Sequence, residues 1–567
     1  MPGIRRSALL ALAVLAGGAA NDFGLESDSG TSAYVPKGGF GAYLAGRLAV
    51  QQGDLDAAAD DLGAALAQDA GVAEVVNQAF VATVLAGRPD AARLAARVAD
   101  NAVAQLVLAD RDAKNEDWEQ AEARFAALPQ QGLTQVLRPL LIAWAQQGAR
   151  RTTAALAGLQ PAVEEPRFRG VMALHAALIA DLGGFTADAG RLYGIARAEY
   201  GGLNIRLGQI LASWQARQGN IDEAQRTIRD MVGANGDLAM ARDALERAVA
   251  DRAVRNATDG IAETYVAMAA TLRQQNANDS AQVLLRLALD LREDFTAARL
   301  LLADVQEAGK QTSAAAQTLA SVPQSDPLAA VVALRRASLL DSMGQENEAA
   351  RMLEALAQQF PDRPEPLIQI GDSLRRRNRF GEAVTAYDRA VARIGTPSRA
   401  NWPLFYERGV ALERSGQWPK AEADFEYTLQ LAPEQPNVLN YLGYAWVEQN
   451  HEVDRARHMI ERAVEQRPND GAFIDSLGWV ELRQGDTAEA LKNLEHAVEL
   501  QPEDPVINAH FGDALDAAGR HREAEFQWRR ALNLKPEPED QARIERKLRD
   551  AEAGPATQTA SPAHDVP

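Results

Sequence analysis

Small and large apolar residues recur at a fixed period along the last third of the chain. Residues 471–504 and 505–538 align without gaps, and their matched positions are Gly478 with Gly512, Gly485 with Gly519, Ala490 with Ala524, Leu494 with Trp528, and Pro502 with Pro536. Residues 402–435 share this register, and residues 436–470 follow it with one extra residue. The pattern predicts a repeated unit built from two helices.

Each recurring position has a physical role in a pair of helices. The small residues at position 8 (Gly478) and position 20 (Ala490) allow the two helices to approach closely, and the large residue at position 24 (Leu494) fills the seam between them. Gly at position 15 ends the first helix, because a left-handed backbone conformation is favourable there. Pro at position 32 ends the second helix. We therefore expect antiparallel helix pairs with Gly478 facing Ala490.

With these features, residues 364–538 resemble the tetratricopeptide repeat family, whose 34-residue units form two antiparallel helices. The resemblance implies an all-α superhelical solenoid. Glycines that suit the turn between two helices recur upstream and predict a degenerate array of helix pairs over residues 39–363. They are Gly53, Gly87, Gly148, Gly183, Gly184, Gly219 and Gly309. The unit that begins at Ile205 and residues 236–260 match the register poorly. Residues 39–538 divided by 34 give fourteen to fifteen helix pairs, and residues 539–553 are expected to form a capping helix.

The first twenty residues have the order of parts of an export signal. Arg5 and Arg6 precede an apolar run over 7–16, which is too short to span a bilayer, and small residues follow up to Ala20. We expect cleavage after Ala20, a flexible linker over 21–38 and a disordered tail over 554–567; the alternative for residues 1–20 is a frayed apolar helix. Residues 15–17 resemble the start of a bacterial lipobox, but Gly18 stands where that motif needs Cys.

Composition excludes several classes of function. The 567 residues include no Cys, so disulfides, thiolate metal sites and a cysteine nucleophile are ruled out. With 59 Lys and Arg against 78 Asp and Glu, the net charge is −19, which argues against a nucleic-acid partner. The length would suit three or four globular domains, unless the chain is one long repeat array.

The sequence carries few patterns typical of catalytic or ligand-binding sites. The sequence has no GxxxxGK[ST], HExxH, GxSxG or EF-hand loop. His451 and His458 lack a third ligand nearby and are read as solvated helix residues, and Arg375–Arg377 is read as a helix end, although it could receive an acidic partner. We expect no catalytic residue, no cofactor and no metal. The rival interpretation is an enzyme with an unrecognised helical domain in residues 132–260.

The family resemblance implies that positions 2, 5, 9 and 12 of each first helix face a concave groove. In the last four units, positions 5 and 9 supply our candidate partner-binding residues, which are Tyr406, Asn440, Tyr444, Asp475, Trp479 and Asp513. Aromatic residues in such a groove suit an extended or helical peptide. The alternative for Tyr444 and Trp479 is packing between neighbouring units. Members that clamp a C-terminal carboxylate need Lys and Asn at these positions, and this chain departs from that pattern.

Three segments, 439–444, 475–479 and 510–515, resemble a narrower group of bacterial envelope tetratricopeptide proteins. That group includes an outer-membrane lipoprotein that brings a carboxy-terminal processing protease to cell-wall hydrolases. The resemblance implies a non-enzymatic, periplasmic scaffold that binds proteins or peptides and has no membrane span of its own. A cytoplasmic assembly factor is the alternative if the N-terminus is retained.

Overall fold

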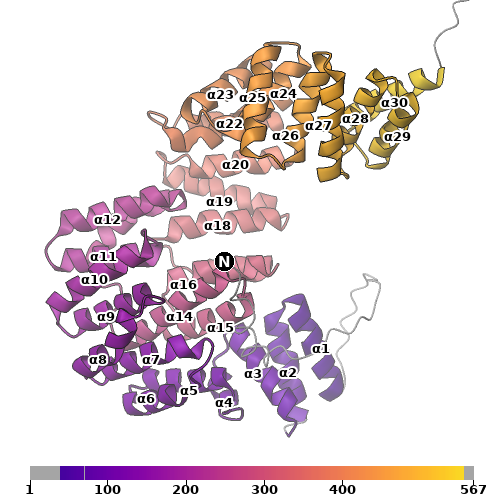
Figure 1. Cartoon of the computed structure of the whole chain (residues 1–567). Coiled ribbons are helices and arrows are strands. Elements are labelled where there is room, and N and C mark those ends of the chain that lie inside the picture. Colours follow the sequence, from indigo (N-terminus) through magenta and orange to yellow (C-terminus); the bar gives the residue numbers. More distant parts are fainter. Residues whose placement is uncertain (1–38, 69–70, 554–567) are drawn as a thin grey trace, which may run out of the picture. The chain divides into compact units, whose positions relative to one another are not determined.

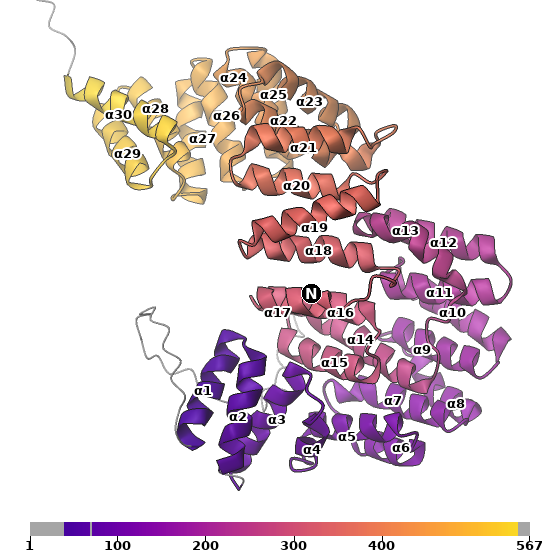
Figure 2. The same cartoon turned by 180° about the vertical axis from the view of Figure 1, so that it is seen from behind.

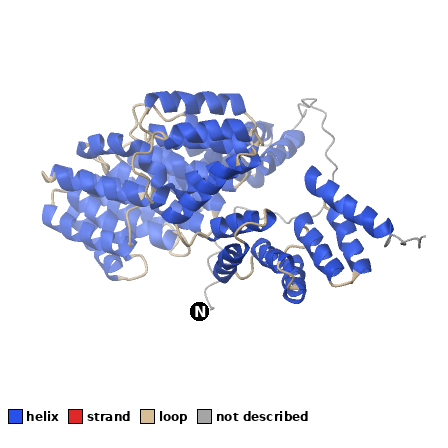
Figure 3. Ribbon diagram, turned by 90° about the horizontal axis from the view of Figure 1, so that it is seen from above, coloured by secondary structure: helices blue, strands red, loops and turns tan. Residues whose placement is uncertain are grey.

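The computed structural model describes residues 39–68 and 71–553, and every regular element in them is helical (Figure 3). The expected signal peptide, linker and tail lie outside these residues. The chain divides into two compact units, residues 1–359 and 360–567, here called unit 1 and unit 2. The predicted fold class, an all-α solenoid of antiparallel helix pairs, is confirmed.

Residues 39–68 and 71–359 of unit 1 form nine helix pairs, and a helix pair here means two consecutive antiparallel helices. They are α1 (Gly39–Gln52) with α2 (Leu55–Gln68), α3 (Ala73–Ala86) with α4 (Ala91–Ala95), α5 (Ala102–Lys114) with α6 (Trp118–Ala127), α7 (Thr134–Gly148) with α8 (Thr152–Glu164), α9 (Arg169–Leu182) with α10 (Thr186–Tyr200), α11 (Ile205–Arg217) with α12 (Ile221–Ala234), α14 (Ala257–Gln274) with α15 (Asn278–Leu291), α16 (Thr296–Ala308) with α17 (Thr312–Ala320), and α18 (Ala329–Ser342) with α19 (Glu346–Gln359).

In unit 2, the described residues up to Ala553 form five more pairs and one further helix after them; Figure 1 labels these helices. The pairs are α20 (Glu365–Arg376) with α21 (Phe380–Val391), α22 (Trp402–Arg414) with α23 (Trp418–Leu431), α24 (Pro436–Glu448) with α25 (Val453–Gln466), α26 (Gly471–Arg483) with α27 (Thr487–Leu500), and α28 (Pro505–Ala517) with α29 (His521–Asn533). The short helix η3 (Arg399–Asn401) precedes α22, and α30 (Pro538–Ala553) follows α29 and buries Ile544 and Leu548.

The turn inside each of the fourteen pairs contains a residue with left-handed backbone, and this residue defines position 15 of the register. These residues are Gly53, Gly87, Glu116, Arg150, Gly184, Gly219, Asn276, Lys310, Gly344, Asn378, Gly416, Asn450, Gly485 and Gly519. The turn expected at Gly148 therefore falls on Arg150, and the turn expected at Gly309–Lys310 has Lys310 as its left-handed residue. Non-Gly residues tolerate this conformation at a cost of about 1–2 kcal/mol, so glycine alone does not mark every repeat.

The predicted close approach of the two helices in a pair is confirmed. A Cβ atom added to Gly478 would lie 2.6 Å from Cγ of Leu494 and 3.2 Å from the carbonyl oxygen of Ala490. Gly512 faces Trp528 in the same way. Because side chains at position 24 fill the space that a larger residue at position 8 would need, these two helix pairs are held in one register.

Unit 1 departs from a simple stack after α12. An irregular segment follows, made of η1 (Gly236–Ala241), α13 (Arg242–Arg247) and η2 (Ala248–Ala250). After it, α14 packs against α7 and α9, and α15 packs against α3 and α5, so these helices lie beside helices far earlier in the chain (Figure 2). Two stretches were expected to match the repeat register poorly. The unit from Ile205 is nevertheless a regular helix pair, α11 with α12, whereas residues 236–256 form no helix pair.

Candidate partner-binding face

The six candidate residues lie on the first helices of four consecutive pairs, α22, α24, α26 and α28. We call the side of these helices that carries positions 5, 6, 9, 12 and 13 the inner face. Tyr406, Asn440, Tyr444 and Asp513 are half-buried there. Asp475 and Trp479 are only 5% and 7% exposed. Four of the six candidates therefore keep a surface that a partner could touch.

Trp479 packs between neighbouring repeats. Its indole stacks on the imidazole of His510 in α28, with ring centroids 4.1 Å apart and planes inclined by 17°. The indole Nε1 donates a hydrogen bond of 2.6 Å to Oε1 of Glu448 in α24. Trp479 thus ties three successive first helices together, which supports the interpretation of this residue as packing between units.

His510 was not among the candidate residues, yet it lies between three of them, Trp479, Asp475 and Tyr444. We call these four residues the His510 cluster. His510 is fully enclosed, and its Nδ1 donates to Asp475 Oδ2 at 2.9 Å. Burial disfavours the charged imidazole, but the charge and the hydrogen bond of Asp475 together outweigh it and raise the pKa of His510. Tyr444 lies 6.2 Å from the imidazole, centroid to centroid, and burial raises the pKa of its hydroxyl.

Carboxylates and cations surround the His510 cluster. Asp513 accepts a 2.9 Å hydrogen bond from Nε1 of Trp528 and forms an ion pair with Lys547 of α30. Arg543, one turn earlier in α30, lies 3.9 Å from Glu448. Through these two side chains, α30 supplies positive charge to the acidic inner face of α24 and α28, in addition to covering the last apolar surface.

Tyrosines dominate the other end of the inner face. Tyr406 lies edge-on to Tyr441 at 6.1 Å, and burial raises the pKa of Tyr406 to about 12. The Tyr441 hydroxyl donates to Oε2 of Glu413 at 3.0 Å. Asn440 lies on the turn of α24 before Tyr444, and its enclosed Oδ1 accepts no hydrogen bond within the described residues. Tyr406, Tyr441 and Asn440 therefore place aromatic and polar groups on this part of the inner face.

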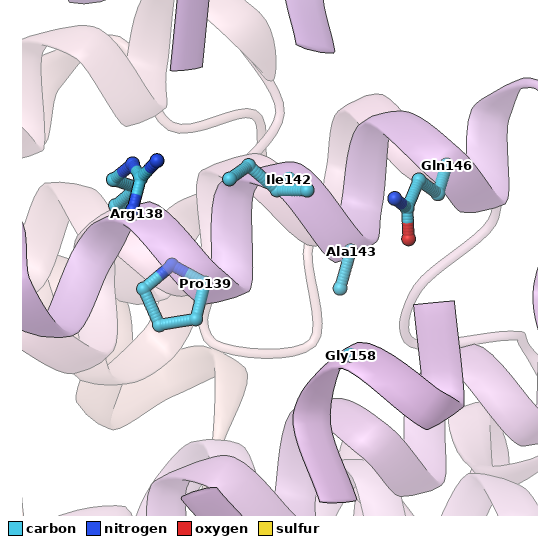
Figure 4. A pocket seen from close by; sticks show the side chains of 6 residues that line it. All are labelled: Arg138, Pro139, Ile142, Ala143, Gln146 and Gly158. Atoms are coloured by element: carbon cyan, nitrogen blue, oxygen red, sulfur yellow. The ribbon is translucent and has the colours of Figure 1, made fainter. Parts of the chain in front are cut away.

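A cavity and the search for metal-ligating groups complete the description of the chain's candidate sites. A cavity of about 250 Å³ lies between α7 and α8 and is lined by Arg138, Pro139, Ile142, Ala143, Gln146 and Gly158 (Figure 4). It contains no carboxylate, imidazole or hydroxyl that could act as a general base. Among the described residues, no three His, Asp or Glu residues are grouped to hold a metal ion. Within the same residues, no helix is long and apolar enough to cross a membrane.

Sequence comparison identifies the repeats. Residues 334–399, 406–471 and 447–505 match one tetratricopeptide repeat model, and residues 481–548 match another. The chain therefore contains tetratricopeptide repeats between residues 334 and 548. It is also similar to a tetratricopeptide repeat-containing protein of Pseudomonas aeruginosa, with 30% identity over 219 residues, which are 38% of this chain and 36% of that protein. The similarity thus spans about a third of the relative's length.

Solved structures with similar folds are more distant in sequence. The APC/C hetero-tetramer Cut9–Hcn1 has 14% identity and a TM-score of 0.38, and the match covers 90% of this chain and 95% of that one. A tetratricopeptide repeat protein from Parabacteroides merdae has 13% identity and a TM-score of 0.35, and the match covers 45% of this chain and 97% of that one.

Proposed function

We propose that this chain is a non-enzymatic scaffold that binds other proteins or peptides through the inner face of unit 2. Tetratricopeptide repeats mediate protein–protein interaction, and the class supports this proposal. The observation that carries it is the row of half-buried aromatic rings, Tyr406, Tyr441 and Tyr444, along consecutive first helices. In unit 1, by contrast, α14 and α15 already pack on the first helices α3, α5, α7 and α9.

The proposal extends to the cell envelope. The order of charged, apolar and small residues over 1–20 supports export, with a mature chain that begins near Asn21. The resemblance to an envelope adaptor supports recruitment of an envelope protease or a cell-wall enzyme. N-terminal sequencing of the protein from fractionated cells tests the location. An intact Met1 in a cytosolic fraction would contradict it.

Quantitative capture tests the binding face. Full-length protein is immobilised and exposed to a native envelope extract, and the captured proteins are quantified by mass spectrometry. We expect Tyr406→Ala with Tyr444→Ala to reduce capture strongly, because an aromatic hot spot contributes about 2 kcal/mol or more to binding. Phe526→Ala is the matched control, since Phe526 is an aromatic residue on the second helix α29 and is 64% exposed.

Melting temperatures of both variants separate binding from folding. If the double variant keeps its melting temperature and loses capture while Phe526→Ala retains it, the inner face is the binding surface. Undiminished capture by a folded double variant would refute the assignment.

A further inference from the structure

One side of α1 is apolar and exposed. Phe40, Leu44 and Leu48 are 75%, 51% and 53% exposed, and they follow one another at intervals of four residues, so they line one side of the helix. We call these three residues the α1 stripe. Of the eight large apolar side chains that are exposed within residues 39–68 and 71–553, four lie on α1, because Val50 is exposed as well. The α1 stripe is therefore a concentrated apolar patch, which is typical of an interaction site.

The α1 stripe occupies positions that later repeats bury. Counted from the left-handed residue Gly53, Leu44 and Leu48 are at positions 6 and 10. In α26 and α28, on which α25 and α27 of the preceding pairs pack, the side chains at these positions are at most 4% exposed; they are Ser476, Val480, His510 and Ala514. α1 thus has the surface on which a further helix packs, but it lies at the outer edge of unit 1 beside α2 (Figure 1).

The last described helix differs from α1 in this respect. α30 buries Ile544 and Leu548 and exposes Gln541, Arg546 and Arg549. A solenoid needs a polar outer face on its terminal repeat to stay soluble. α30 provides such a face, whereas the exposed side of α1 does not.

The charges around the α1 stripe favour a protein helix over a lipid surface. α1 contains one charged residue, Arg47, and no acidic residue. The residues that follow carry four aspartates, which an anionic lipid surface would repel; they are Asp54, Asp56, Asp60 and Asp61. A second copy of α1 meets the stripe without burying a carboxylate, and its long Arg47 side chain can keep its charge in water.

We propose that two copies of the chain form a symmetric dimer in which their α1 helices pack antiparallel through the α1 stripe. The stripe is evenly spaced about Leu44, so a twofold axis beside Leu44 places Phe40 of one copy against Leu48 of the other. Side-chain areas of about 150–200 Å² and the exposed fractions of Phe40, Leu44, Leu48 and Val50 leave about 400 Å² of apolar surface on each copy. The pair buries about 800 Å², which is at the small end of specific interfaces, so we expect a Kd in the micromolar range.

Dimerisation is independent of the inner face of unit 2 and goes beyond the proposed function. Each dimer carries two inner faces, so a partner with two binding sites is held with a higher avidity than one copy provides. The Tyr406→Ala with Tyr444→Ala variant leaves α1 unchanged and should dimerise like the natural chain.

Sedimentation equilibrium tests the dimer on the protein as isolated from its cells, at concentrations from below to well above micromolar. We expect a monomer–dimer equilibrium. Leu44→Glu should weaken the dimer by about tenfold or more, because it brings two carboxylates together at the axis. Phe526→Glu is the matched control, since Phe526 is an exposed apolar residue on α29, and it should leave the equilibrium unchanged. The melting temperature of the monomer should change little in either variant, because both side chains are exposed.

Single cysteines test the position of the axis, because the chain has no Cys of its own. Leu44→Cys places one thiol of each copy beside the axis, and a short bis-maleimide should then link two copies. Phe40→Cys and Leu48→Cys should link poorly alone and efficiently when the two variants are mixed, as antiparallel helices require. Phe526→Cys should stay unlinked. Since Leu44→Cys keeps an uncharged side chain at this position, the test holds even where Leu44→Glu is less stable.

Several results would overturn the inference. A chain that stays monomeric at every concentration and is not linked through Leu44→Cys would exclude the dimer. Equal weakening by Leu44→Glu and Phe526→Glu would exclude the α1 stripe as the contact. A monomer that binds lipid vesicles and loses this binding with Leu44→Glu would assign the stripe to a membrane. A monomer whose melting temperature falls with Leu44→Glu would assign it to residues 1–38 of the same copy.

Discussion

Replacing Gly260 with Ala tests the close contact between Gly260 of α14 and the indole of Trp144 in α7. The new Cβ would lie 2.3 Å from Cε3 of Trp144, whereas carbon atoms pack at about 3.5–4.0 Å. The indole cannot easily yield, because it is fully buried and its Nε1 donates a 3.1 Å hydrogen bond to His175. Overpacking of this kind costs about 1–3 kcal/mol, and we expect the upper end. Since Ala stabilises a helix by about 1 kcal/mol relative to Gly, the net loss should be about 2 kcal/mol.

Gly194 provides a matched control within the same unit. It lies inside α10, and nothing lies within 4 Å of a Cβ added there. Gly194→Ala should therefore stabilise the protein by up to about 1 kcal/mol, so the two variants should differ by about 3 kcal/mol.

Hydrogen exchange is the suitable assay, because a chain of two units does not unfold in a single step. Gly260→Ala should lower amide protection in α7, α9 and α14 and leave α22–α29 unchanged. If Gly260→Ala and Gly194→Ala proved equally stable, with equal amide protection in α7, the close packing of α14 on Trp144 would be refuted.

Three further predictions concern stability. Gly478→Leu should overpack its helix pair and cost about 1–3 kcal/mol, with protection lost mainly in α26, α27 and their neighbours; unchanged exchange there would contradict it. Burial lowers the pKa of His175 to about 3, whereas a histidine in the unfolded chain titrates at about 6.5. As the pH falls below about 6.5, the free energy of unfolding should therefore decrease by about 1.4 kcal/mol per pH unit on account of His175. In denaturant titrations His175→Gln should remove this part of the acid sensitivity, and an identical pH profile of the variant would argue against it. Glu263 is 5% exposed and pairs with Arg206 and Arg292, so Glu263→Ala should cost about 3–5 kcal/mol in urea unfolding, and a loss below about 1 kcal/mol would show that the cluster is not coupled.

Local pattern was sufficient to predict the helix pairs and their seams. Gly478, Ala490 and Leu494 meet as expected, because position in the repeat determines which side chains face each other. Repeats without glycine in their turns were harder to recognise, as at Glu116 and Asn276, since tertiary packing there holds a non-Gly residue in a left-handed conformation. The return of α14 onto α7 could not be predicted, because contacts between distant repeats leave no periodic signal.

The candidate site was predicted in part. Register placed Tyr406, Asn440, Tyr444, Asp475, Trp479 and Asp513 on one face, and whether a partner binds there stays a prediction. His510 was missed because it lies at position 6, outside the positions considered. A signal was present in the sequence: a Trp followed at the same spacing by a His, found at 144 and 175 and again at 479 and 510. Arg543 and Lys547 were assigned only to a cap.

The return of α14 and α15 onto the start of the array has a consequence for how the chain folds during synthesis. Lys114 binds Asp290, 176 residues later, and Tyr265 binds Asp110, 155 residues earlier. Contacts of such high sequence separation form slowly, whereas the helices of unit 2 pack chiefly against helices of their own and the adjacent repeats. The ribosome must therefore release the chain as far as the end of α15 before α3–α9 can complete their packing, and until then their apolar inner side chains stay open to chaperones. Pulsed hydrogen exchange during refolding should show α22–α29 protected before α5 and α7.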